Sequence, residues 1–71
     1  MKNSYDVYLY WDDAIDGDSS GGKILVAQFK MLCDSLEYAN KIYKEYKQWA
    51  TAVIVEVYRQ EKLLKKHATR G

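Results

Sequence analysis

The stretch "DSLEYANKIYKEYKQWATAVIVEVYR", residues 34–59, decides the fold because its hydrophobic period changes once. In its first part, apolar residues recur every three or four positions, which predicts an amphipathic helix over 34–49. Asp34 is followed three residues later by Glu37, a capping-box arrangement, so we expect the helix to begin there. In its second part, the pattern alternates and is rich in β-branched residues, which predicts a strand over 51–60.

Working outward, two more alternating segments precede the helix. They predict strands over 4–11 and 23–31, which we expect to form a hairpin across a loop over 12–22. The charged segment 61–71 reads as a C-terminal tail that extends the last strand, forms a short helix or frays. The order is therefore ββαβ in a single small domain, residues 1–71. We expect a two-layer α+β fold in which one amphipathic helix packs on one face of a three-stranded sheet. The last strand should run parallel to the strand it joins.

Alternation assigns the strand residues to two faces. The helix should cover the face formed by Val7, Leu9, Trp11, Leu25, Ala27, Phe29, Val53, Val55 and Val57. The opposite face should be polar if it meets only water, but its predicted members include Tyr8, Tyr10, Ile24, Val26, Ile54 and Tyr58. A contiguous apolar patch rich in tyrosine is typical of an interface. We therefore expect a protein-binding or homodimer face, with two alternatives: Leu63 and Leu64 fold back over it, or bases stack on it.

Composition narrows the functional classes. A chain of 71 residues with 48% hydrophobic and 30% charged residues is an ordinary small globular protein. One cysteine and one histidine exclude disulfides and make a thiolate or imidazole metal site untenable, so we expect no metal and no cofactor. The single cysteine favours a cytoplasmic location. No apolar run approaches the roughly 18 residues of a membrane span, so we expect no membrane partner.

Charge is unevenly distributed along the chain. Residues 1–22 hold one lysine against five aspartates, and residues 23–71 hold ten lysines and arginines against five acidic residues. The net charge of +1 is a poor match to a uniformly basic nucleic-acid binder. We expect an acidic contact loop and a basic tail. The acidic loop residues are Asp12, Asp13, Asp16 and Asp18, and the basic tail residues are Lys62, Lys65, Lys66 and Arg70.

The loop segment "WDDAIDGDSSGGK", residues 11–23, partly matches three known motifs, and each match fails. A calcium loop beginning at Asp12 would have Ala14 at its third position and Lys23 where a bidentate glutamate belongs. A phosphate loop requires a helix next, but a strand pattern follows. A serine nucleophile requires a base, and the lone His67 lies in the expected tail. The segment is best interpreted as a contact loop or a simple connection.

For the remaining cysteine, histidine and tryptophan residues, the sequence favours structural roles over catalytic ones. We expect Cys33 to be a small buried hydrophobe, with a reactive thiol near the helix N-terminus as the alternative, and we expect His67 to be solvated. Trp11 and Trp49 should pack as core aromatics where the end of the strand meets the end of the helix. Since no carboxylate pair or nucleophile with its base is evident, we expect a protein that is not an enzyme.

The stretch from Phe29 to Arg59 resembles a pattern common in very small phage and mobile-element proteins. In these, a strand ending in Phe-x-x-Leu leads to a capped Leu-x-x-Ala helix and then a valine-rich strand. The matching residues here are Phe29, Leu32, Asp34, Leu36, Ala39 and Val53 to Val57. Proteins of this type include anti-CRISPR and other anti-defence inhibitors and phage inhibitors of uracil-DNA glycosylase. The glycosylase inhibitors resemble DNA in charge, and the net charge of +1 departs from that.

The resemblance implies a ββαβ inhibitor that acts by binding, in the cytoplasm of a bacterial host. We therefore expect a non-enzymatic protein-binding module that inhibits a host defence or nucleic-acid-processing complex. It would use the tyrosine-rich face and the acidic loop, as a homodimer or with another protein partner. The alternative is a single-stranded nucleic-acid-binding protein that stacks bases on Tyr8, Tyr10 and Tyr58.

Overall fold

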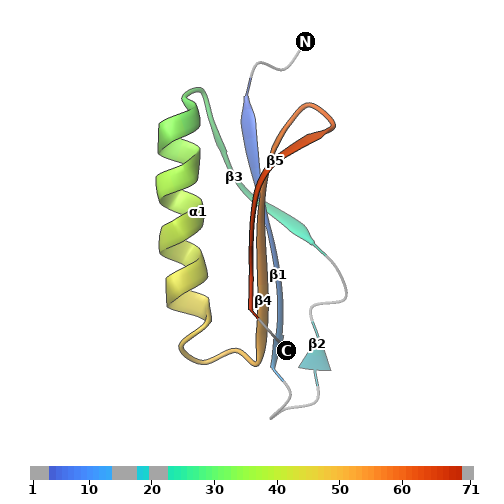
Figure 1. Ribbon diagram of the computed structural model, residues 1–71. Helices are drawn as coiled ribbons and strands as arrows, with labels where there is room; N and C mark the ends of the chain where they lie inside the picture. The colour runs from blue at the N-terminus through green and yellow to red at the C-terminus, as the bar shows by residue number, and fades with distance from the viewer. Residues whose placement is uncertain (1–3, 14–17, 20–22, 70–71) are drawn as a thin grey trace.

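The computed structural model describes residues 4–13, 18–19 and 23–69. A single helix packs on one face of an antiparallel sheet (Figure 1), which confirms the predicted α+β class and its helix-on-sheet arrangement. In chain order the elements are β1 (Tyr5–Asp13), β2 (Asp18–Ser19), β3 (Ile24–Phe29), α1 (Leu32–Tyr46), β4 (Ala52–Arg59) and β5 (Lys62–Ala68).

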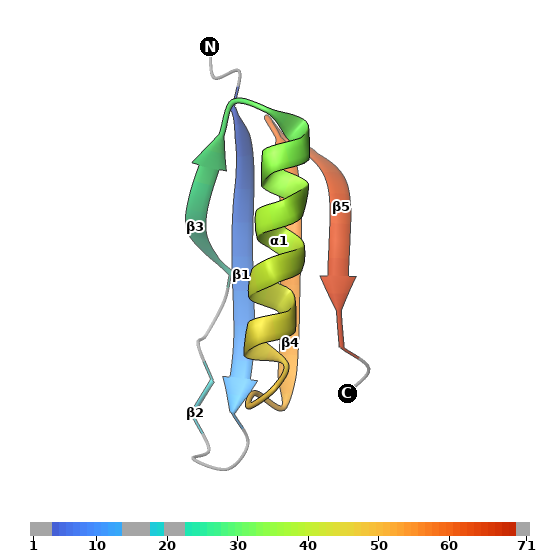
Figure 2. The ribbon, with the colours of Figure 1, turned by 90° about the vertical axis from the view of Figure 1, so that its left-hand side faces the viewer.

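The sheet has four long strands in the order β3-β1-β4-β5, so the predicted three-stranded sheet is wrong. The short β2 pairs with the end of β1 on the same side as β3 (Figure 2). The extra strand comes from the segment expected to be a tail, which turns back at residues 60–61 and pairs along β4 as β5. Gln60 occupies the left-handed region at φ 57°, a conformation that turns usually assign to glycine or asparagine.

Strand direction also differs from the prediction. β4 joins β1 and runs antiparallel to it, not parallel. The reason is that β1 lies between β3 and β4. The chain leaves β3, passes along α1 and returns beyond β1, so both long neighbours of β1 run antiparallel to it (Figure 2).

The core lies between α1 and the two central strands, as alternation predicts for β1 and β4. Each of its five strand side chains is at most 2% exposed, and these are Val7, Leu9, Val53, Val55 and Val57. From the helix, Ala39 and Ile42 complete the buried cluster, and the Ser35 hydroxyl is buried beside them. This Ser35 hydroxyl donates a 2.6 Å hydrogen bond to the carbonyl of Leu32, so the buried polar group is satisfied within the helix.

Both helix ends lie closer to the N-terminus than predicted. The N-cap residue is Met31, and its side chain makes no capping hydrogen bond, so the predicted Asp34 capping box is wrong. Asp34 instead lies in the first turn, where its charge favours the positive end of the helix dipole. Residues 47–49 form a turn rather than helix. There Trp49 packs edge-on against Trp11 with ring centroids 5.1 Å apart, which confirms the expected contact. Trp49 is nevertheless 48% exposed, so the prediction that it is a core aromatic is wrong.

A β-bulge in β3 changes the faces of its residues. Val7 pairs with Ala27, but the next residue, Tyr8, pairs with Leu25, so one residue of β3 is extra. Leu25 therefore lies on the face of Tyr8, and Ile24, opposite Leu9, lies on the helix side. The extra residue, Val26, packs against the core. The predicted faces of Ile24, Leu25 and Val26 are wrong because strict alternation fails at a bulge.

Candidate functional site

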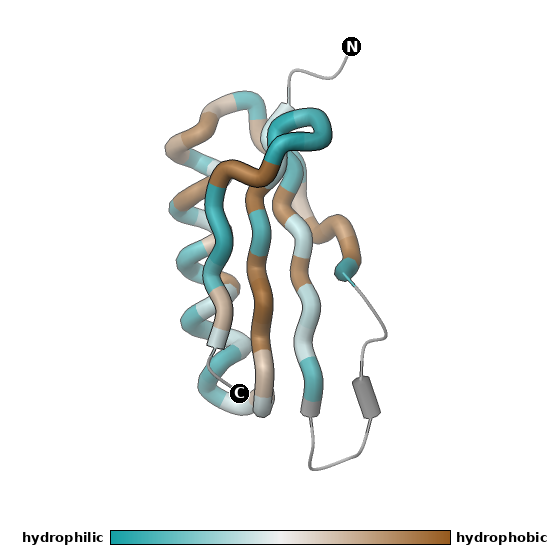
Figure 3. The backbone as a smooth tube through the Cα atoms, turned by 45° about the vertical axis from the view of Figure 1, so that its right-hand side comes forward, coloured by the Kyte–Doolittle hydropathy of each residue, from teal (hydrophilic) through white to brown (hydrophobic). Residues whose placement is uncertain are grey.

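The sheet face away from α1 is here called the open face, and none of the described helices or strands packs on it (Figure 3). Cross-strand pairs place side chains from all four long strands on it. At its centre Leu25, Tyr8, Glu56 and Lys66 form one row across the sheet. The other side chains on this face are Asp6, Tyr10, Gln28, Ile54, Tyr58, Leu63 and Ala68.

Two carboxylates on the open face are buried although no described element covers them. Asp6 and Glu56 are only 8% and 6% exposed. Asp6 Oδ1 accepts hydrogen bonds from Gln28 Nε2 at 3.0 Å and from the Ser4 hydroxyl at 3.2 Å. A buried charge is costly unless hydrogen-bonded or paired, and these donors offset that cost for Asp6.

Glu56 is held differently, by a lysine that reaches across a strand. Lys23 precedes β3, and its side chain crosses β1 to bring Nζ within 2.8 Å of Glu56 Oε1 on β4. At this distance the Lys23 ammonium is the counter-ion of the buried Glu56 carboxylate and offsets the cost of burying its charge. The contact with Glu56 raises the pKa of the Lys23 ammonium, and the Tyr58 hydroxyl raises it further.

The aromatic rings of the open face are also fixed by contacts. Tyr8 and Tyr58 meet edge-to-face, with centroids 5.6 Å apart and planes at 90°. Lys23 Nζ lies 5.3 Å from the centroid of the Tyr58 ring and donates a 3.4 Å hydrogen bond to its hydroxyl. One lysine therefore joins a buried carboxylate to a tyrosine pair, through charge and a cation–π contact.

An open depression of about 360 Å³ lies on this face and is called the open-face pocket. Its lining residues are Tyr10, Lys23, Ile54, Glu56 and Lys66. The two lysines approach Glu56 from opposite edges of the sheet, since Lys23 precedes β3 and Lys66 belongs to β5. With the carboxylate between them, the pocket carries a formal charge of +1.

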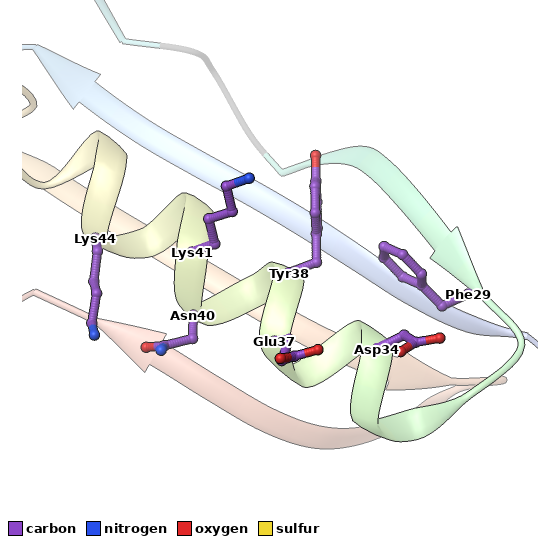
Figure 4. Close-up of a pocket in the computed structure, with 7 residues that line it drawn as sticks. All are labelled: Phe29, Asp34, Glu37, Tyr38, Asn40, Lys41 and Lys44. Atoms are coloured by element: carbon purple, nitrogen blue, oxygen red, sulfur yellow. The ribbon is translucent and has the colours of Figure 1, made fainter.

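A second depression, about 620 Å³, lies against the outer surface of α1 and the end of β3 (Figure 4). Its side chains do not converge. In Figure 4, Glu37, Asn40 and Lys44 extend to one side of the helix, whereas Tyr38 and Lys41 extend toward β3. Phe29 packs against Tyr38 at a centroid distance of 5.3 Å, which extends the core rather than forming a site.

The acidic loop is only partly described. The backbones of Asp12 and Asp13 belong to β1 and pair with Ser19 and Asp18 of β2, so the expected loop contains a two-residue ladder. Asp16 lies outside the described residues.

The predicted basic tail does not form one basic surface. Lys66 pairs with Glu56 on the open face, whereas Lys65 pairs with Val57 and therefore lies on the helix side. Lys62 pairs with Arg59 at the β4–β5 turn. Arg70 lies outside the described residues.

Two single-residue predictions need correction. Cys33 is exposed in the first turn of α1, not buried, because the helix begins earlier than predicted and turns this position outward. His67 is half-buried rather than solvated, and its ring stacks on Tyr43 with centroids 5.3 Å apart. Burial lowers the pKa of His67, and the charge of Lys65 lowers it further.

Sequence reasoning missed the role of Glu56. The alternating pattern assigns no partner to Glu56 and makes Lys23 only the first residue of the strand 23–31. The available signal was a lone carboxylate within a valine-rich strand, which predicts a cationic partner because an unpaired buried charge is costly. Its partner lies 33 positions away in sequence, so only the strand order identifies Lys23.

Neither a metal site nor a membrane-spanning helix is found in the described part of the chain, and the comparisons with known proteins give no match. Among the described residues, no group of three His, Cys, Asp or Glu side chains is arranged to hold a metal ion. No helix in the same part of the chain is long and apolar enough to cross a membrane. Comparison with protein-family models, curated proteins and solved structures found no match.

Proposed function

We propose that this chain is a non-enzymatic module that binds another protein through the open face. The observation that carries this proposal is a set of four half-buried side chains on a face that no described element covers, namely Tyr8, Tyr10, Ile54 and Tyr58. Tyrosine and aliphatic side chains are typical of interface cores. Because the strands and ring contacts already fix these side chains, binding would cost little conformational entropy.

Charge favours a different protein over a second copy of this chain. The centre of the open face carries Lys23 and Lys66 around one carboxylate. A symmetric contact centred here would bring the same lysines of two copies together, because a two-fold interface pairs a patch with itself. A partner with an apolar surface and an acidic group complements this centre better.

The inhibitor role is a finer part of the same proposal. The resemblance to small phage proteins supports a module that acts by occupying a surface of a host complex. The exposed Cys33 has one polar side-chain contact within the described structure, a weak hydrogen bond from its Sγ to Asp34 Oδ1 at 3.9 Å, and it lines neither of the two depressions. A binding role therefore has more support than nucleophilic catalysis.

Base stacking has less support than protein binding. One face of the Tyr58 ring carries Lys23, and its edge contact with Tyr8 occupies a second ring. The tail lysines also divide between the two sides of the sheet, whereas single-stranded nucleic acid follows a continuous basic groove.

The test compares capture by matched variants. Ile54→Arg places a charge in the centre of the open face, and Asn40→Arg places the same residue on the exposed surface of α1. We expect a bacterial-lysate protein to be retained by the wild type and by Asn40→Arg and lost with Ile54→Arg. Circular dichroism would establish that each variant is folded, and Tyr10→Arg provides a second open-face variant if Ile54→Arg is unfolded.

Three results would contradict the proposal. One is retention that is insensitive to both open-face variants. Another is a dimer in sedimentation that dissociates on Ile54→Arg, which would make a second copy the occupant. The third is binding of oligothymidylate that weakens steeply with salt and is lost with Tyr8→Ala, which would favour the nucleic-acid alternative.

A further inference from the structure

We propose that the open-face pocket is a receptor for one carboxylate side chain of the protein partner, held between Lys23 and Lys66. This inference rests on the proposed function, since it names the chemical group that the partner inserts. It is carried by the position of the two ammonium groups and by the burial of Glu56 between them.

Lys66 is the group with spare binding capacity. Its side chain is exposed, and within the described residues it makes no hydrogen bond or ion pair. It lies in the same cross-strand row as Glu56, so the Glu56 carboxylate favours its position without satisfying its three donors. Lys23 is 47% exposed at its side chain despite its contacts, so it also has donors directed to solvent.

Glu56 limits what the pocket accepts. Its side chain is 8% exposed, and its Oε1 atom lies 2.8 Å from Lys23 Nζ, so the carboxylate stays in the pocket as a fixed negative charge. The formal pocket charge of +1 matches one carboxylate, whereas a dianion would experience repulsion from Glu56 at short range.

The surroundings favour an isolated acidic side chain over a nucleic-acid backbone. Asp6 and Asp12 belong to β1, before and after Tyr8 and Tyr10, so carboxylates follow the strand in both directions from the pocket. A run of phosphates would therefore encounter an acidic residue on either side. The apolar walls, Tyr10 and Ile54, instead fit the hydrocarbon part of an acidic side chain and its apolar neighbours.

The test uses a capped short peptide with a central aspartate between leucines, and the same peptide with asparagine. Binding is followed by the NMR chemical shifts of the Glu56 and Lys66 amides. We expect the aspartate peptide to shift these signals at concentrations up to about 10 mM, with at least a fivefold weaker effect for the asparagine peptide. Lys66→Gln should remove this preference, whereas Lys44→Gln, on the exposed surface of α1, should retain it.

Lys66 is chosen because substitution of Lys23 would leave Glu56 buried without its counter-ion and endanger the fold. Equal binding of the two peptides, or no shift at the highest concentration, would overturn the carboxylate assignment. Stronger shifts with inorganic phosphate or oligothymidylate than with the aspartate peptide would also overturn it.

The peptide experiment tests the carboxylate receptor and the capture experiment tests the protein-binding function, so each proposal can be contradicted without the other. If Ile54→Arg abolishes capture but Lys66→Gln leaves the peptide preference unchanged, the protein-binding proposal stands and the carboxylate receptor is wrong. If capture is insensitive to Ile54→Arg while the aspartate peptide still binds in a Lys66-dependent way, the pocket assignment stands without the proposed function.

Discussion

The two faces of the sheet bury their side chains in different ways. On the helix side, Val7, Leu9 and Val55 are buried because α1 lies on top of them. On the open face none of the described elements lies on top, yet Asp6 and Glu56 are as buried as Ile42 of the core. Their neighbours achieve this, because long side chains such as Lys23 and Tyr58 fold across the strands. On the helix side, side chains are buried because a second layer packs on the sheet. On the open face, they are buried by side chains of neighbouring strands.

The strongest test of this comparison is to delete one side chain from each face. Leu9→Ala removes a side chain that is 2% exposed, and we expect the free energy of unfolding to fall by about 2–5 kcal/mol. Ile54→Ala on the open face should cost less, because Ile54 is only half-buried and solvent can fill the space. Urea unfolding of both variants measures the difference. Equal losses would show that the open face is as much a core as the helix side.

The covered face could be predicted from local sequence for physical reasons. Alternation in β1 and β4 and the apolar stripe of α1 each follow from backbone geometry, so the predicted faces of Val7, Leu9 and Val55 are correct. The helix and the valine-rich strand required no information from distant residues.

The open face and the edges could not be predicted in the same way. The bulge at Val26 reverses the faces in β3, and its position depends on how β3 meets β1. The turn before β5 lacks the Asn-Gly or Asp-Gly signal of a tight hairpin, and Gln60 adopts a left-handed conformation in its place. Without that signal the fourth strand was read as a tail, and Lys66 could not be placed beside Glu56.

A second test addresses the edge of the covered face, where burial is incomplete and a titratable group is present. The pKa of His67 is lowered in the folded chain by burial and by Lys65, so the unfolded chain binds more protons near pH 6. Stability should therefore be fully present above the unfolded pKa of about 6.5 and decrease as pH falls through the lower folded pKa. The effect should be smaller than that of Leu9→Ala.

The measurement is urea unfolding across this pH range for the wild type and for His67→Phe. The phenylalanine ring can still stack on Tyr43 but cannot titrate, so its stability should not show the His67-dependent decrease. Lys47, whose Nζ lies 5.3 Å from the centroid of the Tyr43 ring, contributes a further positive charge near the contact between Tyr43 and His67. Identical pH profiles for the two proteins would show that the β5 edge is not packed closely enough to disfavour protonation of His67.

The smallest expected change in stability is that of Leu25→Lys in β3, a strand whose residues divide between the two faces of the sheet. Strict alternation places Leu25 in the core, where replacement by lysine would bury an unpaired charge and cost several kcal/mol. The bulge instead places it on the open face opposite Tyr8, where it is 46% exposed. Leu25→Lys should therefore change the free energy of unfolding by no more than about 0.5 kcal/mol.

The matched control is Ala27→Lys, two residues along β3 on the helix side, which should be clearly destabilising because Ala27 packs against the core. If Leu25→Lys is the more damaging substitution, the register of β3 is wrong, and with it the placement of Lys23 beside Glu56.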